Sequence, residues 1–82
     1  PAFGEMCENA IFYKLMYTAL AGFAGSDEVC VHVAPQALSK AVGQRRANVT
    51  ALERALGIGR VRVRPDAGLA GRRLFAVPVE KD

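Results

Sequence analysis

The chain has 82 residues, of which 51% are hydrophobic and 23% charged, and its formal net charge is +3. This size and composition predict one small globular domain and exclude a disordered tail. Two cysteines exclude a disulfide framework, and the longest apolar stretch, residues 11–24, is interrupted by Lys14 and is shorter than the roughly 20 residues that a membrane span requires.

The charges are distributed unevenly along the chain. Residues 1–39 carry Lys14 against four acids, a sum of −3, whereas residues 40–73 carry nine cations against Glu53 and Asp66, a sum of +7. Eight of these nine cations are arginines, whose planar, forked donors suit phosphates and base edges. The second half of the chain is therefore expected to attract a polyanion.

Residues 5–23 predict the first and longest helix. Glu5 and Glu8 lie in its first turn, where the helix dipole favours acids and where a secretion signal would be basic. Its apolar surface is wide, and a third stripe of Tyr13, Tyr17 and Leu20 exceeds what a small core needs. This surplus indicates a homodimer seam or an adjoining domain; the alternative is a central helix that its own chain covers.

Residues 28–34, EVCVHVA, alternate with period two and predict a strand that buries its valines. Cys30 and His32 fall on its other face. A metal site built from these two residues and Cys7 would lack a fourth ligand, so we expect ordinary packing and no metal or cofactor.

Residues 35–56 predict two short helices that meet at Gly43. Val49 and Leu52 are the inward residues of the second helix, and glycine is the residue best suited to end the first. Arg45 stands where a serine-type cap is usual, so we expect the second helix to lack a side-chain cap.

Residues 60–80 predict two strands joined as a hairpin. In RVRVR the valines face inward, and in LFAVPVE the inward residues are Phe75, Val77 and Val79. Pro78 removes a hydrogen-bond donor and belongs at an edge or a strand end.

The order helix, strand, helix, turn, helix, strand, strand resembles the winged helix-turn-helix family. The segment QALSKAVGQRRANVTALERAL looks like its helix-turn-helix, and RVRVRPDAGLAGRRLFAVPVE looks like its wing. The resemblance implies one α+β domain over residues 1–82, with three helices and a small three-stranded antiparallel sheet. It further implies the order helix (5–23), strand (28–34), helix-turn-helix (35–56) and wing hairpin (60–80).

This resemblance implies sequence-specific binding of double-stranded DNA by a cytoplasmic, nucleoid-associated transcriptional regulator or replication or partition protein. Arg46 and Thr50 would contact base edges, because a helix start projects deepest into the major groove. The remaining contacts, mostly to phosphates, would come from Gln44, Arg45, Asn48, Arg54, Arg62, Arg64, Arg72 and Arg73.

Two alternatives use the same residues. Strand, helix, GxxG loop, helix, strand is also the core of a KH domain, which grips single-stranded RNA or DNA; here the loop is GQRR, so Arg46 occupies the second glycine position. The other alternative is a protein-interaction module that works through its first helix. We do not expect an enzyme, because the sequence has one histidine, no nucleophile beside a base and no paired carboxylates.

Overall fold

Three α-helices and a three-stranded sheet make up residues 2–79, the part of the chain that the computed structural model describes, with side chains from residue 8 onward. The helices are α1 (Ala2–Leu20), α2 (Leu38–Val42) and α3 (Ala47–Leu56), and the strands are β1 (Glu28–Val33), β2 (Arg60–Pro65) and β3 (Leu74–Pro78). Short 3-10 segments span Ala21–Phe23, Pro35–Ala37 and Gln44–Arg46. The predicted α+β class is confirmed. The predicted last residue of the hairpin, Glu80, and the side chain of Cys7 lie outside what is described.

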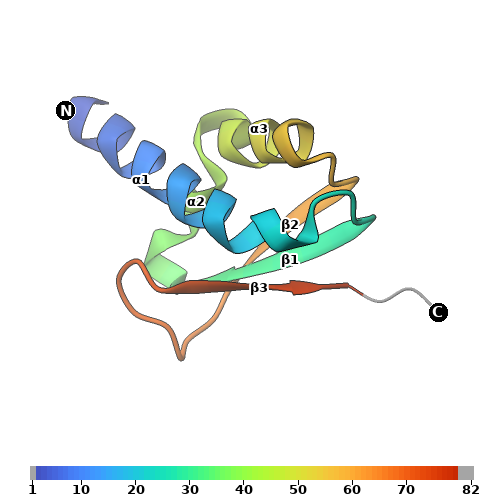
Figure 1. Cartoon of the computed structure of the whole chain (residues 1–82). Coiled ribbons are helices and arrows are strands. Elements are labelled where there is room, and N and C mark those ends of the chain that lie inside the picture. The colour runs from blue at the N-terminus through green and yellow to red at the C-terminus, as the bar shows by residue number, and fades with distance from the viewer. Residues whose placement is uncertain (1, 80–82) are drawn as a thin grey trace.

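The sheet is mixed, with the strand order β2-β1-β3. β1 runs parallel to β2, with Val29 opposite Val61, and antiparallel to β3, with Val31 opposite Ala76. The predicted antiparallel sheet is therefore wrong for the β1–β2 pair. The predicted wing hairpin is also wrong, since β2 and β3 lie on opposite sides of β1 (Figure 1).

The composition of the strands explains why β1 is central. β1 has valine at every inward position and buries nearly its whole length. β2 alternates valine with arginine and β3 ends at Pro78, and both charged residues and proline are features that protect edge strands. Residues 66–73 are long enough to pass β1, because β2 and β3 are separated by only two strand spacings, roughly 10 Å.

The core lies between the sheet and the helices, and α1 and α3 lie over the same face of the sheet (Figure 1). Fully buried side chains come from α1, from all inward positions of β1, from α3 and from β2: Phe12, Met16, Leu20, Val29, Val31, Val33, Val49, Leu52 and Val61. Leu20 therefore belongs to this chain's own core and is not available to a partner, although Tyr17 of the same predicted stripe is exposed. No helix within residues 2–79 is long and apolar enough to cross a membrane.

The inward face of β3 is the opposite of the predicted one. Leu74 and Ala76 pack against the core, whereas Phe75, Val77 and Val79 are 41%, 39% and 36% exposed. The reason is that a period-two pattern gives the alternation but not its phase, and in LFAVPV both phases are apolar. The sheet face away from the helices consequently carries large apolar side chains.

Hydrogen bonds at the start of β2 hold it beside β1. The N–H of Gly59 donates to the carbonyl of Ser26 at 3.0 Å, and the N–H of Val61 donates to the Glu53 carboxylate of α3 at 2.9 Å. A Cβ on Gly59 would lie 2.6 Å from the carbonyl oxygen of Asp27, so only glycine permits this approach. Glu53 of α3 thus fixes the first inward residue of β2.

Candidate nucleic-acid interface

The turn between α2 and α3 has an unusual backbone. Gly43 has a φ of 83°, and Arg45 and Arg46 have φ values of 55° and 61°, in the left-handed region that side chains disfavour. No side chain caps α3, as predicted, but the cap residue is Arg46, one position after the predicted Arg45. Two arginines thus occupy backbone conformations that glycine adopts more easily.

Close contacts with Asn48 hold this turn in place. A Cβ on Gly43 would lie 2.9 Å from the backbone nitrogen of Asn48, which excludes a larger residue there. The Nδ2 atom of Asn48 donates to the carbonyl of Asn9 in α1 at 2.9 Å and to that of Lys40 in α2 at 3.3 Å. Its amide therefore joins the first turn of α3 to α1 and α2, which differs from the predicted phosphate contact.

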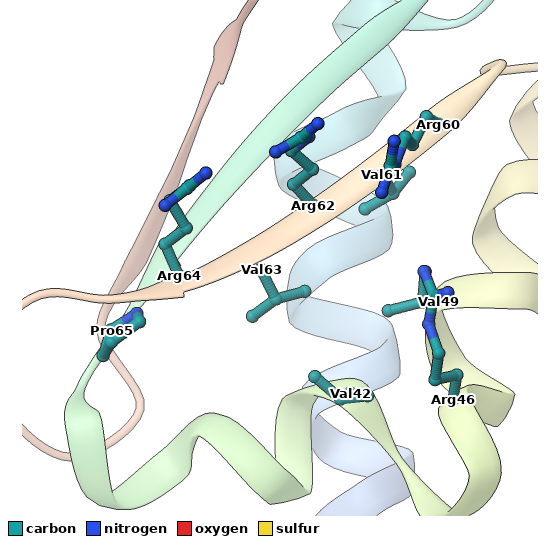
Figure 2. Close-up of a pocket in the computed structure, with 9 residues that line it drawn as sticks. All are labelled: Val42, Arg46, Val49, Arg60, Val61, Arg62, Val63, Arg64 and Pro65. Atoms are coloured by element: carbon teal, nitrogen blue, oxygen red, sulfur yellow. The ribbon is translucent and has the colours of Figure 1, made fainter.

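A groove of about 330 Å³ separates the turn from β2. Apolar side chains from both walls form part of its lining, and guanidinium groups border them (Figure 2). The lining residues are Val42, Arg46, Val49, Arg60, Val61, Arg62, Val63, Arg64 and Pro65. Among the valines, Val42 and Val63 are partly exposed, whereas Val49 and Val61 are buried beneath them. The side chain of Arg46 extends from the turn towards β2, so both walls supply positive charge (Figure 2).

The backbone of β2 also faces this groove. The N–H of Asp66 donates to the carbonyl of Val33 in β1. The backbone N–H and C=O groups of successive strand residues point to opposite edges of the strand, so those of Arg64, Arg62 and Arg60 also point to β1. Val61 and Val63 then direct theirs away from β1. The N–H of Val61 is bonded to Glu53, so the N–H and C=O of Val63 are the adjacent donor and acceptor presented to the groove.

The groove is strongly positive. Arg46, Arg60 and Arg64 are exposed, and no acidic residue is among the residues that line it. Arg62 forms an ion pair with Glu28 of β1 through its Nε atom. Three guanidinium groups from two elements thus remain to attract an anion, close to an apolar lining.

The structure brings together only some of the predicted site residues. Arg46, Arg62 and Arg64 line the groove, whereas Gln44 lines a neighbouring hollow beside α1. The remaining exposed ones do not line the groove: Arg45, Thr50, Arg54, Arg72 and Arg73. Arg60 also lines the groove but was not among the predicted contacts, although its place in the alternating RVRVR segment could have identified it. The apolar part of the lining was not predicted either, because it depends on tertiary packing.

Arg72 has a partner on α1. Its Nη2 atom donates to the Glu8 carboxylate at 2.9 Å, and this hydrogen bond holds the pKa of Glu8 below its ordinary value. The contact fastens residues 66–73 to α1. The arginine predicted to hold DNA at a wing therefore lies in an ion pair within the chain.

No protein-family model, curated protein or solved structure matches this chain significantly.

Proposed function

We propose that this domain binds single-stranded nucleic acid in the groove between the α2–α3 turn and β2. One observation carries the proposal: Arg46 on one wall and Arg60 and Arg64 on the other border an apolar lining, beside an open strand edge. Single-strand sites combine these three features, since cations contact the phosphates, apolar surface packs on the bases, and backbone groups pair with base edges.

Both resemblances share the observed order of elements, but the sheet order β2-β1-β3, in which β2 and β3 do not pair, supports the KH alternative over the winged helix. The expected strand, helix, GxxG-type loop, helix and strand correspond to β1, α2, the GQRR turn, α3 and β2. A KH loop clamps about four nucleotides of backbone. Arg45 and Arg46 keep left-handed φ values without being glycine, and the guanidinium of Arg46 adds a charge beside the path of the phosphates.

Duplex binding has less support. That prediction required a hairpin wing beside the helix start, but β2 and β3 do not pair, and Arg72 is bonded to Glu8. Thr50 and Arg54, expected to contact a duplex from α3, do not line the groove. Binding to double-stranded DNA stays a prediction, which the same experiment tests.

The experiment measures fluorescence anisotropy with randomised four-nucleotide RNA and DNA and with a 20-base-pair duplex, at several salt concentrations. Arg46→Ala should weaken binding to the four-nucleotide probes about tenfold, the loss expected for a charge-assisted hydrogen bond. Arg64→Ala should reduce the steepness of the plot of log affinity against log salt concentration by about 0.7, the contribution of one phosphate contact on a single strand. The matched control is Arg54→Ala, which removes the same charge from α3 outside the groove.

The control separates the two kinds of ligand. If the groove binds single strands, Arg54→Ala leaves the affinity unchanged within about twofold, because that residue does not contact the ligand. Preference for the duplex, together with a loss in Arg54→Ala as large as that in Arg46→Ala, would favour the winged-helix function and refute the groove proposal.

A further inference from the structure

The sheet face away from the helices has two different halves. Strand register places Arg64, His32 and Phe75 in one row across β2, β1 and β3. The next row of the same face contains Arg62, Cys30 and Val77. Cations thus lie on the β2 side and apolar groups on the β3 side. An isolated apolar patch would indicate protein contact. An apolar patch that adjoins arginine side chains, as here, is complementary to a ligand with both anionic and aromatic parts.

An exposed aromatic stack lies in this face. The rings of His32 and Phe75 are stacked, with centroids 4.7 Å apart and planes 14° apart. Phe75 is nevertheless 41% exposed, because this stacking uses only one face of its ring. Aromatic rings held in this way are the surfaces on which single-stranded bases stack.

The outer face is continuous with the groove. Arg62 and Arg64 line the groove beside the turn and also a hollow of about 450 Å³ on the outer face, where they meet Glu28, Cys30, His32 and Val79. Glu28 is the ion-pair partner of Arg62, so Arg64 is the free cation among these lining residues. Their side chains extend from β2 on the side of the sheet away from α1 (Figure 2). A phosphate bound by the Arg64 guanidinium is therefore at the border of both surfaces.

We propose that a single strand longer than the groove passes around the β2 edge and stacks a base on Phe75. This inference rests on the proposed function, because the strand enters from the groove. Arg64 holds a phosphate at the edge, and Phe75, two strand spacings or roughly 10 Å away, takes a base a few nucleotides farther along. The ligand is a single-stranded nucleic acid of more than four nucleotides.

The test compares randomised single-stranded probes of four and ten nucleotides by fluorescence anisotropy, using the full chain. Phe75→Leu keeps an apolar side chain but removes the ring, and should weaken binding of the ten-nucleotide probe roughly 5- to 150-fold, the measured range for one base–aromatic stack. The four-nucleotide probe should bind unchanged. Phe75→Trp should restore the longer probe's affinity, and Val77→Ala, an exposed position on the same face, is the matched control.

Several results would overturn this inference. One is an unchanged affinity of Phe75→Leu for the longer probe; another is an equal loss from Val77→Ala, which would indicate general apolar contact. Light scattering that shows a dimer dissociated by Phe75→Leu would assign the face to a second copy of the chain. The proposed function fails separately, if Arg46→Ala does not affect the four-nucleotide probe. If neither probe binds, both proposals fail.

Discussion

Replacing Arg46 with glycine should make the domain more stable. Arg46 has a φ of 61° and directly precedes α3. In this conformation the Cβ atom crowds the following carbonyl oxygen, and glycine has no Cβ. No side-chain hydrogen bond caps α3 at this position, so the substitution removes no cap.

The size of the effect follows from two opposing terms. A left-handed conformation costs a residue other than glycine about 1–2 kcal/mol. Glycine loses more backbone freedom on folding, a cost of about 0.5–1 kcal/mol. The net gain spans about 0–1.5 kcal/mol with a midpoint near 0.75 kcal/mol, and for a domain of this size that midpoint corresponds to a rise in Tm of roughly 3–6 °C.

Thermal unfolding followed by circular dichroism measures this gain, with two controls. Arg46→Ala removes the guanidinium but keeps a Cβ, so its Tm should stay near that of the parent. Ala47→Gly places glycine one residue later, where φ is −59°, and should lower stability by about 0.5–1 kcal/mol. If Arg46→Ala raises the Tm as much as Arg46→Gly, charge repulsion rather than backbone strain is responsible. A fall in Tm for Arg46→Gly would refute the reasoning outright.

Two further predictions concern the packing of other segments. Gly59→Ala should destabilise the domain by about 1–3 kcal/mol in urea denaturation, because its Cβ would lie 2.6 Å from the carbonyl oxygen of Asp27. The control is Gly22→Ala, whose Cβ would meet no atom of a non-neighbouring residue within 4 Å and which should change stability by less than about 1 kcal/mol. Equal losses in the two variants would contradict the prediction. The bond from Arg72 lowers the pKa of Glu8 below 4.5, so the pair stabilises the fold above that pH and the contribution disappears as the pH falls through the lowered pKa. Glu8→Gln should therefore be less stable than the parent at neutral pH, and the difference should shrink as acid protonates Glu8; a difference that does not shrink would show that the charge is not the cause.

The sequence singled out some of the residues that line the candidate groove. The arginine alternation of RVRVR and the GQRR turn identified Arg46, Arg62 and Arg64, which the structure brings to one groove. It assigned Asn48 to a ligand, but its amide bonds to α1 and α2. A polar residue at the start of a helix offers the same hydrogen-bonding groups to a ligand and to the protein backbone, and only the positions of distant segments determine which one it meets.

The order of the elements was determined by local information: helical and alternating apolar periods, the glycine at residue 43, and valine at the inward positions of β1. Which strands pair, and which face of β3 is buried, depended on the tertiary structure. β2 has valines on one face and arginines on the other, and β3 is apolar on both faces. Neither pattern specifies which strand lies next to it. The parallel arrangement that places β2 beside the α2–α3 turn comes from contacts between residues far apart in the chain, such as Gly59 with Ser26 and Asp66 with Val33. This arrangement creates the groove.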